Sequence, residues 1–244
     1  MSIANLNKRN LMMLVLAMAV VFSLIVSSNV NAQGVDLGKQ ELTVDSYVSY
    51  LQKESQTDFR AEQTLTKFKQ LSASDKKKFI EYMTNPKVQE DMANTLSTLE
   101  KGETKKIYGG DITVSLDTTE YRSSSNNNIS CSGCTFGYID SYASFGYFGI
   151  PVSKVGQRMY YYVKRGKVYK PITNNGWISY NYLPLTSYSM TKGHTYTSHN
   201  YTRANAHMYW TLNFVYKGFG LVKSWDHKVW GDANRKSGVI VKPI

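Results

Sequence analysis

Three of the chain's four histidines lie within one short stretch, GHTYTSHNYTRANAHMYW, at residues 193–210. Imidazole groups serve as metal ligands and as general bases, so this stretch is the first place to look for chemistry. A metal ion needs at least three side chains that converge on one point, and no carboxylate lies between Asp140 and Asp226 to help. His194 and His199 are an odd number of residues apart, so they would point to opposite faces of a shared strand. We therefore expect no metal site and no cofactor, and we interpret the histidines as solvent-facing.

One pairing of histidines stays open. His207 lies on the polar face of a predicted strand, and His227 follows Asp226 in the next predicted strand. Neighbouring antiparallel strands could bring His207 and His227 opposite each other. A metal site there would still need further ligands from elsewhere in the sheet.

The two cysteines form the motif Cys131-Ser-Gly-Cys134. In an exported protein such a pair favours a small-loop disulfide, which would give order to the Ser- and Asn-rich residues before it. A redox-active dithiol would place the motif at the start of a helix, but Thr-Phe-Gly-Tyr follows. A zinc site that combines both cysteines with two histidines is the other alternative, with its halves some 60 residues apart. We predict the disulfide.

Recognisable catalytic motifs are absent from the sequence. It contains no G-x-S-x-G, no H-E-x-x-H and no paired catalytic carboxylates, and only six acidic residues occur from residue 107 to the end. A cysteine–histidine nucleophile could assemble in space, but oxidised cysteines leave no thiolate to attack a substrate. We expect a protein that is not an enzyme, and a hydrolase remains the alternative.

The N-terminus has the pattern of a secretory signal peptide. Lys8 and Arg9 precede an uncharged apolar run, and a small-residue cleavage site ends at Ala32. We predict a signal peptide at residues 1–32 that signal peptidase removes between Ala32 and Gln33, and hence a secreted, extracellular protein. The alternative is a retained N-terminal anchor, because the two patterns overlap.

Charge and aromatic residues are unevenly distributed along the chain. Residues 33–106 contain 12 Lys and Arg against 12 Asp and Glu, whereas residues 107–244 contain 15 against 6, a net charge of +9. The second part also holds 16 of the 19 tyrosines and all four tryptophans. An exported part of this kind will concentrate at anionic surfaces, such as a bacterial membrane or an anionic wall polymer, and we expect no nucleic-acid partner. Solubilising surface charge is the alternative interpretation.

The expected architecture is α+β. In residues 33–100 apolar side chains recur at helical spacing, and Ser72 and Asn85-Pro86 mark helix starts, which predicts a small helical segment that could be a pro-region. The polar, basic residues 101–110 predict a linker, where a maturation protease could cut.

Residues 111–244 are expected to form an antiparallel β sandwich or barrel. Seven even-numbered positions in a row from 204 to 216 are apolar, which is the strongest strand pattern in the chain. Lys164, Arg165 and Gly166 predict a hairpin turn between two strands. Further strands are expected within residues 111–116, 138–152, 177–183, 221–230 and 239–242.

Tyrosine and tryptophan residues alternate with lysine and arginine along two of these segments. Such mixtures suit membrane interfaces, sugar rings and phosphate groups, although about half of the rings must face the core. The candidate envelope-binding residues are Tyr161, Lys164, Arg165, Lys167, Lys170, Lys223, Trp225 and Lys228.

The layout resembles that of large exported bacteriocins of the geobacillin type. The likeness covers the whole chain and lies in its organisation, in the sequence FIEYMTNP at residues 79–86 and in the strand at residues 204–216. It implies an antibacterial protein, released by proteolysis, that acts at the target envelope; no motif transfers residue by residue. The leading hypothesis is a non-enzymatic, cationic antibacterial protein, and the alternative is an exported wall- or glycan-binding adhesion module without killing activity.

Overall fold

The computed structural model describes residues 41–123, 131 and 133–244 of the 244-residue chain. This part opens with four α-helices at Val44–Glu54 (α2), Phe59–Gln70 (α3), Ala73–Thr84 (α4) and Pro86–Leu96 (α5). The Ser72 hydroxyl accepts a hydrogen bond from the Asp75 amide, and the Asn85 side chain accepts one from the Lys87 amide, with Pro86 as the first helical residue. Both helix starts predicted from the sequence are confirmed, because each cap satisfies an amide that has no partner within its helix.

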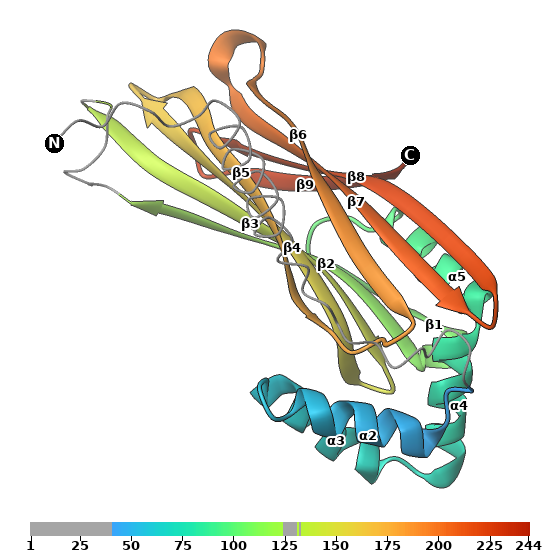
Figure 1. The fold of residues 1–244 in the computed structure, drawn as a ribbon. Helices are drawn as coiled ribbons and strands as arrows, with labels where there is room; N and C mark the ends of the chain where they lie inside the picture. Colours follow the sequence, from blue (N-terminus) through green and yellow to red (C-terminus); the bar gives the residue numbers. More distant parts are fainter. Residues whose placement is uncertain (1–40, 124–130, 132) are drawn as a thin grey trace, which may run out of the picture. The chain divides into compact units, whose positions relative to one another are not determined.

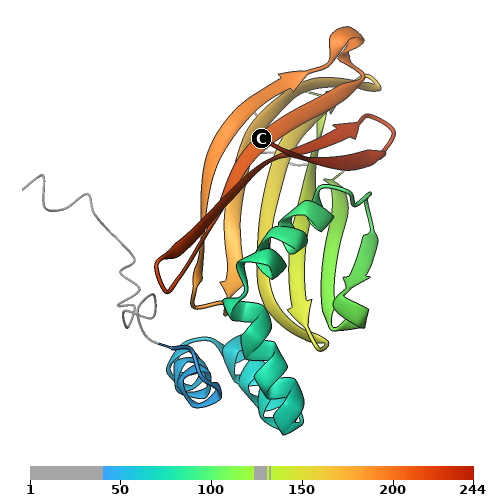
Figure 2. The ribbon, with the colours of Figure 1, turned by 90° about the vertical axis from the view of Figure 1, so that its right-hand side faces the viewer.

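Among the described residues, nine antiparallel strands follow the helices and form two sheets (Figures 1 and 2). The five-stranded sheet consists of Glu103–Ile107 (β1), Ile112–Ser123 (β2), Cys134–Tyr147 (β3), Ile150–Lys164 (β4) and Lys167–Asn181 (β5). The four-stranded sheet consists of Thr186–Thr197 (β6), Arg203–Tyr216 (β7), Phe219–Asp232 (β8) and Ser237–Pro243 (β9). The sheets pack face to face, since β5 contacts β6 and β7 while β3 and β4 contact β8. The predicted α+β class with an antiparallel sandwich is confirmed.

Alternate side chains of β7 form much of the core on the inner face of the four-stranded sheet. Its even-numbered side chains from Ala204 to Phe214 are buried, and Trp210 is among the largest fully buried side chains of the described residues. The predicted strand and its inward face are therefore confirmed.

The prediction of a linker at residues 101–110 was wrong. It contains β1, whose five residues pair with β2 in a register that places Ile107 opposite Ile112. Tyr108–Gly110 (η1) forms the turn between the two strands, where Gly109 and Gly110 adopt left-handed backbone angles. A polar composition is compatible with β1 because it is the edge strand of its sheet.

The prediction of strands also needs correction at two other places. Residues 138–152 form parts of two strands, because Phe148 and Gly149 turn the chain with left-handed backbone angles. The strand β6 was not predicted, and most of its side chains beyond Tyr188 are exposed on both faces, so it lacks the alternation that marks a half-buried strand.

The helices and the sandwich share one core. The Phe79 ring contacts the rings of Tyr47, Phe68 and Tyr147 at centroid distances of 5.5, 5.0 and 5.2 Å. The Tyr47 hydroxyl donates a hydrogen bond to the carbonyl oxygen of Tyr182 over 3.1 Å. The described residues from 41 to 244 accordingly form one compact unit.

The predicted signal peptide and its cleavage site at Ala32 and Gln33 lie outside the described residues. In the part that the structure describes, every helix is too short or too polar to cross a lipid bilayer.

Candidate anion-binding site

The histidines are separated by the register of β7 and β8. His207 pairs with Lys228 and Met208 pairs with His227, so the two imidazoles lie on opposite faces of the sheet. The pair of histidines left open by the sequence is therefore not formed. His194 and His199 are exposed as expected, and within the described ranges no three His, Cys, Asp or Glu side chains gather in a way that could hold a metal ion.

Each of the two separated histidines has a local partner. The Nδ1 atom of His207 lies 2.8 Å from Oδ2 of Asp226 on the outer face, with the Tyr196 ring stacked on the imidazole. His227 is fully buried, contrary to the solvent-facing prediction, and its Nε2 atom lies 2.9 Å from the Ser141 hydroxyl. Burial lowers the pKa of His227 to about 4, so its imidazole is neutral at pH 7. A substrate cannot reach this serine–histidine pair, since Ser141 is also fully buried.

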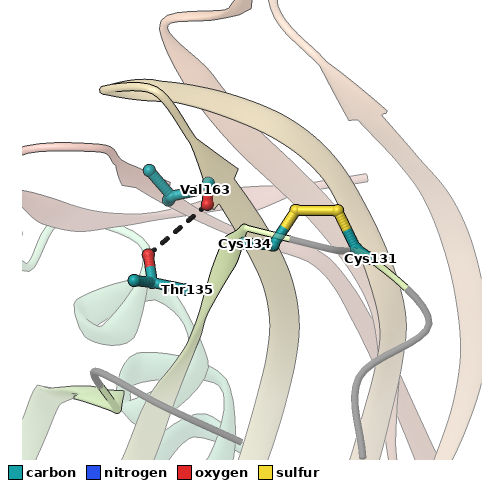
Figure 3. The surroundings of a disulfide bond; sticks show 4 residues. All are labelled: Cys131, Cys134, Thr135 and Val163. Carbon is teal, nitrogen blue, oxygen red and sulfur yellow. Dashed lines mark hydrogen bonds between the residues drawn. A yellow bond between two sulfur atoms is a disulfide. The ribbon is translucent and has the colours of Figure 1, made fainter. Parts of the chain in front are cut away.

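The disulfide bond between Cys131 and Cys134 is present, with the two Cα atoms 5.6 Å apart (Figure 3). Cys134 begins the strand β3, which agrees with the absence of a helix start in the sequence. It lies opposite Lys164, and the neighbouring Thr135 hydroxyl donates a hydrogen bond to the Val163 carbonyl oxygen over 3.4 Å. The disulfide thus lies beside the end of β4, where the candidate cationic residues begin.

The hairpin between β4 and β5 presents four of the candidate cations. Arg165 and Gly166 form its two-residue turn with φ angles of 50° and 72°, as the sequence predicted. Lys164 and Lys167 face each other across this turn. Lys170 follows on β5, and the ammonium groups of Lys164 and Lys170 lie 6.0 and 5.9 Å from the Tyr169 ring centre.

A shallow hollow of about 340 Å³ lies beside this turn. Tyr201 reaches it from the short helix His199–Tyr201 (η2) between β6 and β7, and 58% of this residue is exposed, against 49% of Tyr169. The residues that line the hollow are Lys164, Arg165, Lys167, Val168, Tyr169 and Tyr201. Three cationic groups and two phenols, with no carboxylate among them, suit an anion such as a phosphate group. We refer to these six residues and Lys170 as the cationic end.

The acidic side chains of the β part form ion pairs or hydrogen bonds with other groups of the protein. Asp111 binds Lys78, Glu120 lies 3.6 Å from Arg122, Asp140 binds Arg158, and Asp226 binds His207. Asp232 accepts hydrogen bonds from backbone amides of the β8–β9 turn, and Asp117 accepts one from the Thr118 amide. The cationic end therefore keeps its positive charge.

The eight candidate envelope-binding residues do not form one surface. Lys164, Arg165, Lys167 and Lys170 converge, but Lys223 binds Glu90 of α5 at 2.6 Å, and Lys228 donates a hydrogen bond to the Tyr196 hydroxyl on the outer face of the four-stranded sheet.

The prediction that Tyr161 and Trp225 lie on the surface was wrong. Both occupy strand positions whose side chains point into the core, and only 0% and 3% of these residues are exposed. The Tyr161 hydroxyl donates a hydrogen bond to Glu120 over 2.7 Å, and its pKa is raised mainly by burial. Tyr201 was missed, since its position beside the hairpin depends on the packing of η2 against β5 and leaves no signal in the local sequence. No family model, curated protein or solved structure matches this chain.

Proposed function

We propose that the mature chain is a secreted, cationic antibacterial protein that binds the anionic surface of a bacterial envelope through the cationic end and acts without catalysis. The observation that carries this proposal is the open hollow lined by Lys164, Arg165 and Lys167 together with Tyr169 and Tyr201. The similarity in layout to exported bacteriocins of the geobacillin type supports the antibacterial part of the proposal.

Phosphate-bearing surfaces match the chemistry of the hollow. A guanidinium group binds phosphate oxygens in a bidentate manner, and the lysine ammonium groups add charge without fixed geometry. Exposed tyrosines place an apolar ring and a hydroxyl at the boundary between headgroups and acyl chains. The net charge of +9 in residues 107–244 adds long-range attraction to the same surface.

The test compares the cationic end with an equal loss of charge elsewhere. In one variant Lys164, Arg165 and Lys167 become Gln, Asn and Gln, since asparagine tolerates the left-handed backbone at position 165. In the control, the exposed helix residues Lys67, Lys69 and Lys77 become Gln. Each basic residue near an anionic membrane contributes about 1 kcal/mol, so the first variant should bind phosphatidylglycerol-containing vesicles about a hundredfold more weakly at low salt.

Vesicle sedimentation and survival of sensitive bacteria are measured on the same preparations. We expect the control to retain both binding and killing, and phosphatidylcholine vesicles to bind neither protein. Equal losses in both variants would show that net charge alone drives the association. Binding to walls or vesicles with full survival of every strain would instead favour the wall-binding module without killing activity.

A further inference from the structure

The outer face of the five-stranded sheet carries a continuous set of aromatic rings. These rings come from four neighbouring strands, and most of them are partly exposed: Tyr121, Phe136, Tyr138, Tyr142, Tyr160, Tyr162 and Trp177. The described helices reach this sheet elsewhere, through contacts of α3 with β4 and of α5 with β2. We refer to these rings, with Arg158 and Asp140 between them, as the aromatic face.

Strand register places the rings in rows across the sheet. Tyr121, Tyr138 and Tyr160 stand opposite one another on β2, β3 and β4. The first two rings are stacked with centroids 5.1 Å apart, and Tyr138 and Tyr160 are 5.7 Å apart. Phe136, on the same strand as Tyr138, stacks on Tyr160 with centroids 5.3 Å apart. At the other end of the row, 49% of Tyr121 is exposed.

The Trp177 indole lies directly against Gly156, which has no side chain to displace it. A Cβ atom added to Gly156 would be 2.7 Å from the Trp177 indole and 3.1 Å from the Tyr142 ring. The edge of one ring meets the other at a centroid distance of 5.7 Å. The missing side chain at position 156 thus lets the indole cover the strand instead of projecting from it.

A polar pair occupies the middle of the aromatic face. Arg158 binds both carboxylate oxygens of Asp140, and it donates a hydrogen bond to the Tyr160 hydroxyl over 3.1 Å. The Tyr142 hydroxyl donates one to Asp140 over 3.1 Å. The guanidinium carbon lies 4.4 Å from the Tyr138 ring centre, yet 33% of the Arg158 side chain stays exposed. Asn175, opposite Arg158 on β5, is exposed beside it, and its Oδ1 atom accepts a hydrogen bond from the Lys192 ammonium group over 3.0 Å.

We propose that the aromatic face binds a neutral carbohydrate chain. Sugar rings would stack their C–H faces on Tyr121 and Trp177 at the two ends of the face, while Arg158 and the Nδ2 group of Asn175 hydrogen-bond the hydroxyl groups between them. Flat rings beside fixed polar groups suit sugars, which present both an apolar face and hydroxyls. This binding surface adjoins the cationic end, because Tyr162 pairs with Lys170 in the register of β4 and β5, but it does not depend on the proposed antibacterial action.

A lipid bilayer is a poorer fit to the same residues. The paired charges of Arg158 and Asp140 lie at the centre of the face, where insertion into lipid would remove water from an exposed guanidinium. The ion pair also cancels the charge of Arg158 and Asp140 themselves, while the Lys154 ammonium group lies at the side of the face, 4.0 Å from the Tyr142 ring centre.

The experiment titrates the mature protein with a soluble neutral hexasaccharide of N-acetylglucosamine and with a panel of neutral glucose and mannose oligomers. Calorimetry and tryptophan fluorescence report binding. We expect at least one oligosaccharide to bind, and Trp177→Ala and Tyr121→Ala to weaken it about tenfold or more. Trp230→Phe on the other sheet is the control and should leave binding unchanged, as should the triple variant of the cationic end.

Urea unfolding of each variant shows whether it is folded, and Tyr121→Ala, at a half-exposed position, keeps the test valid if Trp177→Ala unfolds. Failure of every neutral oligosaccharide to bind would overturn the proposal, as would equal affinities in the wild type and both aromatic variants. Sedimentation analysis adds a third contrary outcome: self-association that Trp177→Ala abolishes would make the face an interface between copies of this chain. None of these results depends on vesicle binding or killing, which test the cationic end.

Discussion

His227 should make the stability of the sandwich depend on pH. Its imidazole is fully buried on the inner face of β8, and Nε2 contacts the Ser141 hydroxyl at 2.9 Å. The other ring nitrogen, Nδ1, has no hydrogen-bond partner among the described residues. Protonation would therefore place an unpaired charge between the two sheets, and burial is the cause of its lowered pKa.

The size of the effect follows from the two pKa values. In the unfolded chain the pKa of His227 returns to its ordinary value near 6.5, whereas in the folded chain it is about 4. Between these values the unfolded state binds a proton that the folded state does not, so the free energy of unfolding falls as the pH falls, by about 1.4 kcal/mol per pH unit. From pH 7 to pH 4.5 the loss comes to about 2.5 kcal/mol, and it levels off below pH 4.

The variant His227→Gln isolates this contribution. Glutamine can still bind Ser141, but it cannot take up a proton at these pH values. At pH 7 the wild type should be the more stable protein, because glutamine does not fill the space of the imidazole. The difference in the free energy of unfolding between the wild type and the variant should fall by about 2.5 kcal/mol from pH 7 to pH 4.5. The carboxylates titrate in both proteins, so their effect cancels in this difference.

Urea unfolding, followed by tryptophan fluorescence at pH 7, 6, 5 and 4.5, provides the free energies. His194→Gln, at an exposed position, is the control and should unfold in parallel with the wild type across this range. A constant difference between wild type and His227→Gln would refute the reasoning, because it would mean that the buried imidazole takes up its proton equally in both states.

Three further predictions concern the fold. Replacing both Cys131 and Cys134 by Ser should lower the free energy of unfolding by about 2 kcal/mol, the value for a loop of this length, and thiol titration of the folded wild type should find no free cysteine. Gly156→Ala should cost about 1 to 3 kcal/mol and change the fluorescence of Trp177, because the new methyl group would meet the indole at 2.7 Å; an unchanged spectrum and urea midpoint would contradict the close packing. A chain that starts at residue 101 should aggregate or expose apolar surface to a hydrophobic dye, because Tyr147 loses its contact with Phe79; a soluble, cooperatively unfolding product would show that the helices are dispensable.

The sequence predicted elements best where local chemistry decides them. The helix starts at Ser72 and Asn85 were readable because a cap is made by residues within three positions of one another. The strand β7 was readable because one of its faces is apolar and the other is mostly polar. In contrast, β1 and β6 lack that alternation, and neighbouring strands fix them through backbone pairing that leaves no local pattern.

The sites were harder to predict because β4 is aromatic on both faces. In Met159-Tyr160-Tyr161-Tyr162-Val163 the sequence does not show which tyrosines turn inward. The register with β3 and β5 decides this, so that Tyr161 enters the core and Tyr160 joins the aromatic face. The cluster of Lys164, Arg165, Lys167 and Lys170 was predictable because a short hairpin keeps its residues together, whereas Tyr201 comes from η2, which connects two strands of the other sheet.

The helices influence where the positive charge of the protein remains. Asp111 and Lys223 of the β part form ion pairs with Lys78 and Glu90 of the helices, at the end of the sheets away from the β4–β5 turn. Asp111 and Lys223 are thus paired, while Lys164, Arg165 and Lys167 remain beside an open hollow. Since the attraction of an exposed charge decays within about 10 Å at moderate salt, the proposed function predicts that the cationic end faces the anionic surface. Removal of the helices would release Asp111 and Lys223 from their partners and would expose part of the core, but these two freed charges cancel, so the cationic end would remain the more positive end of the sandwich.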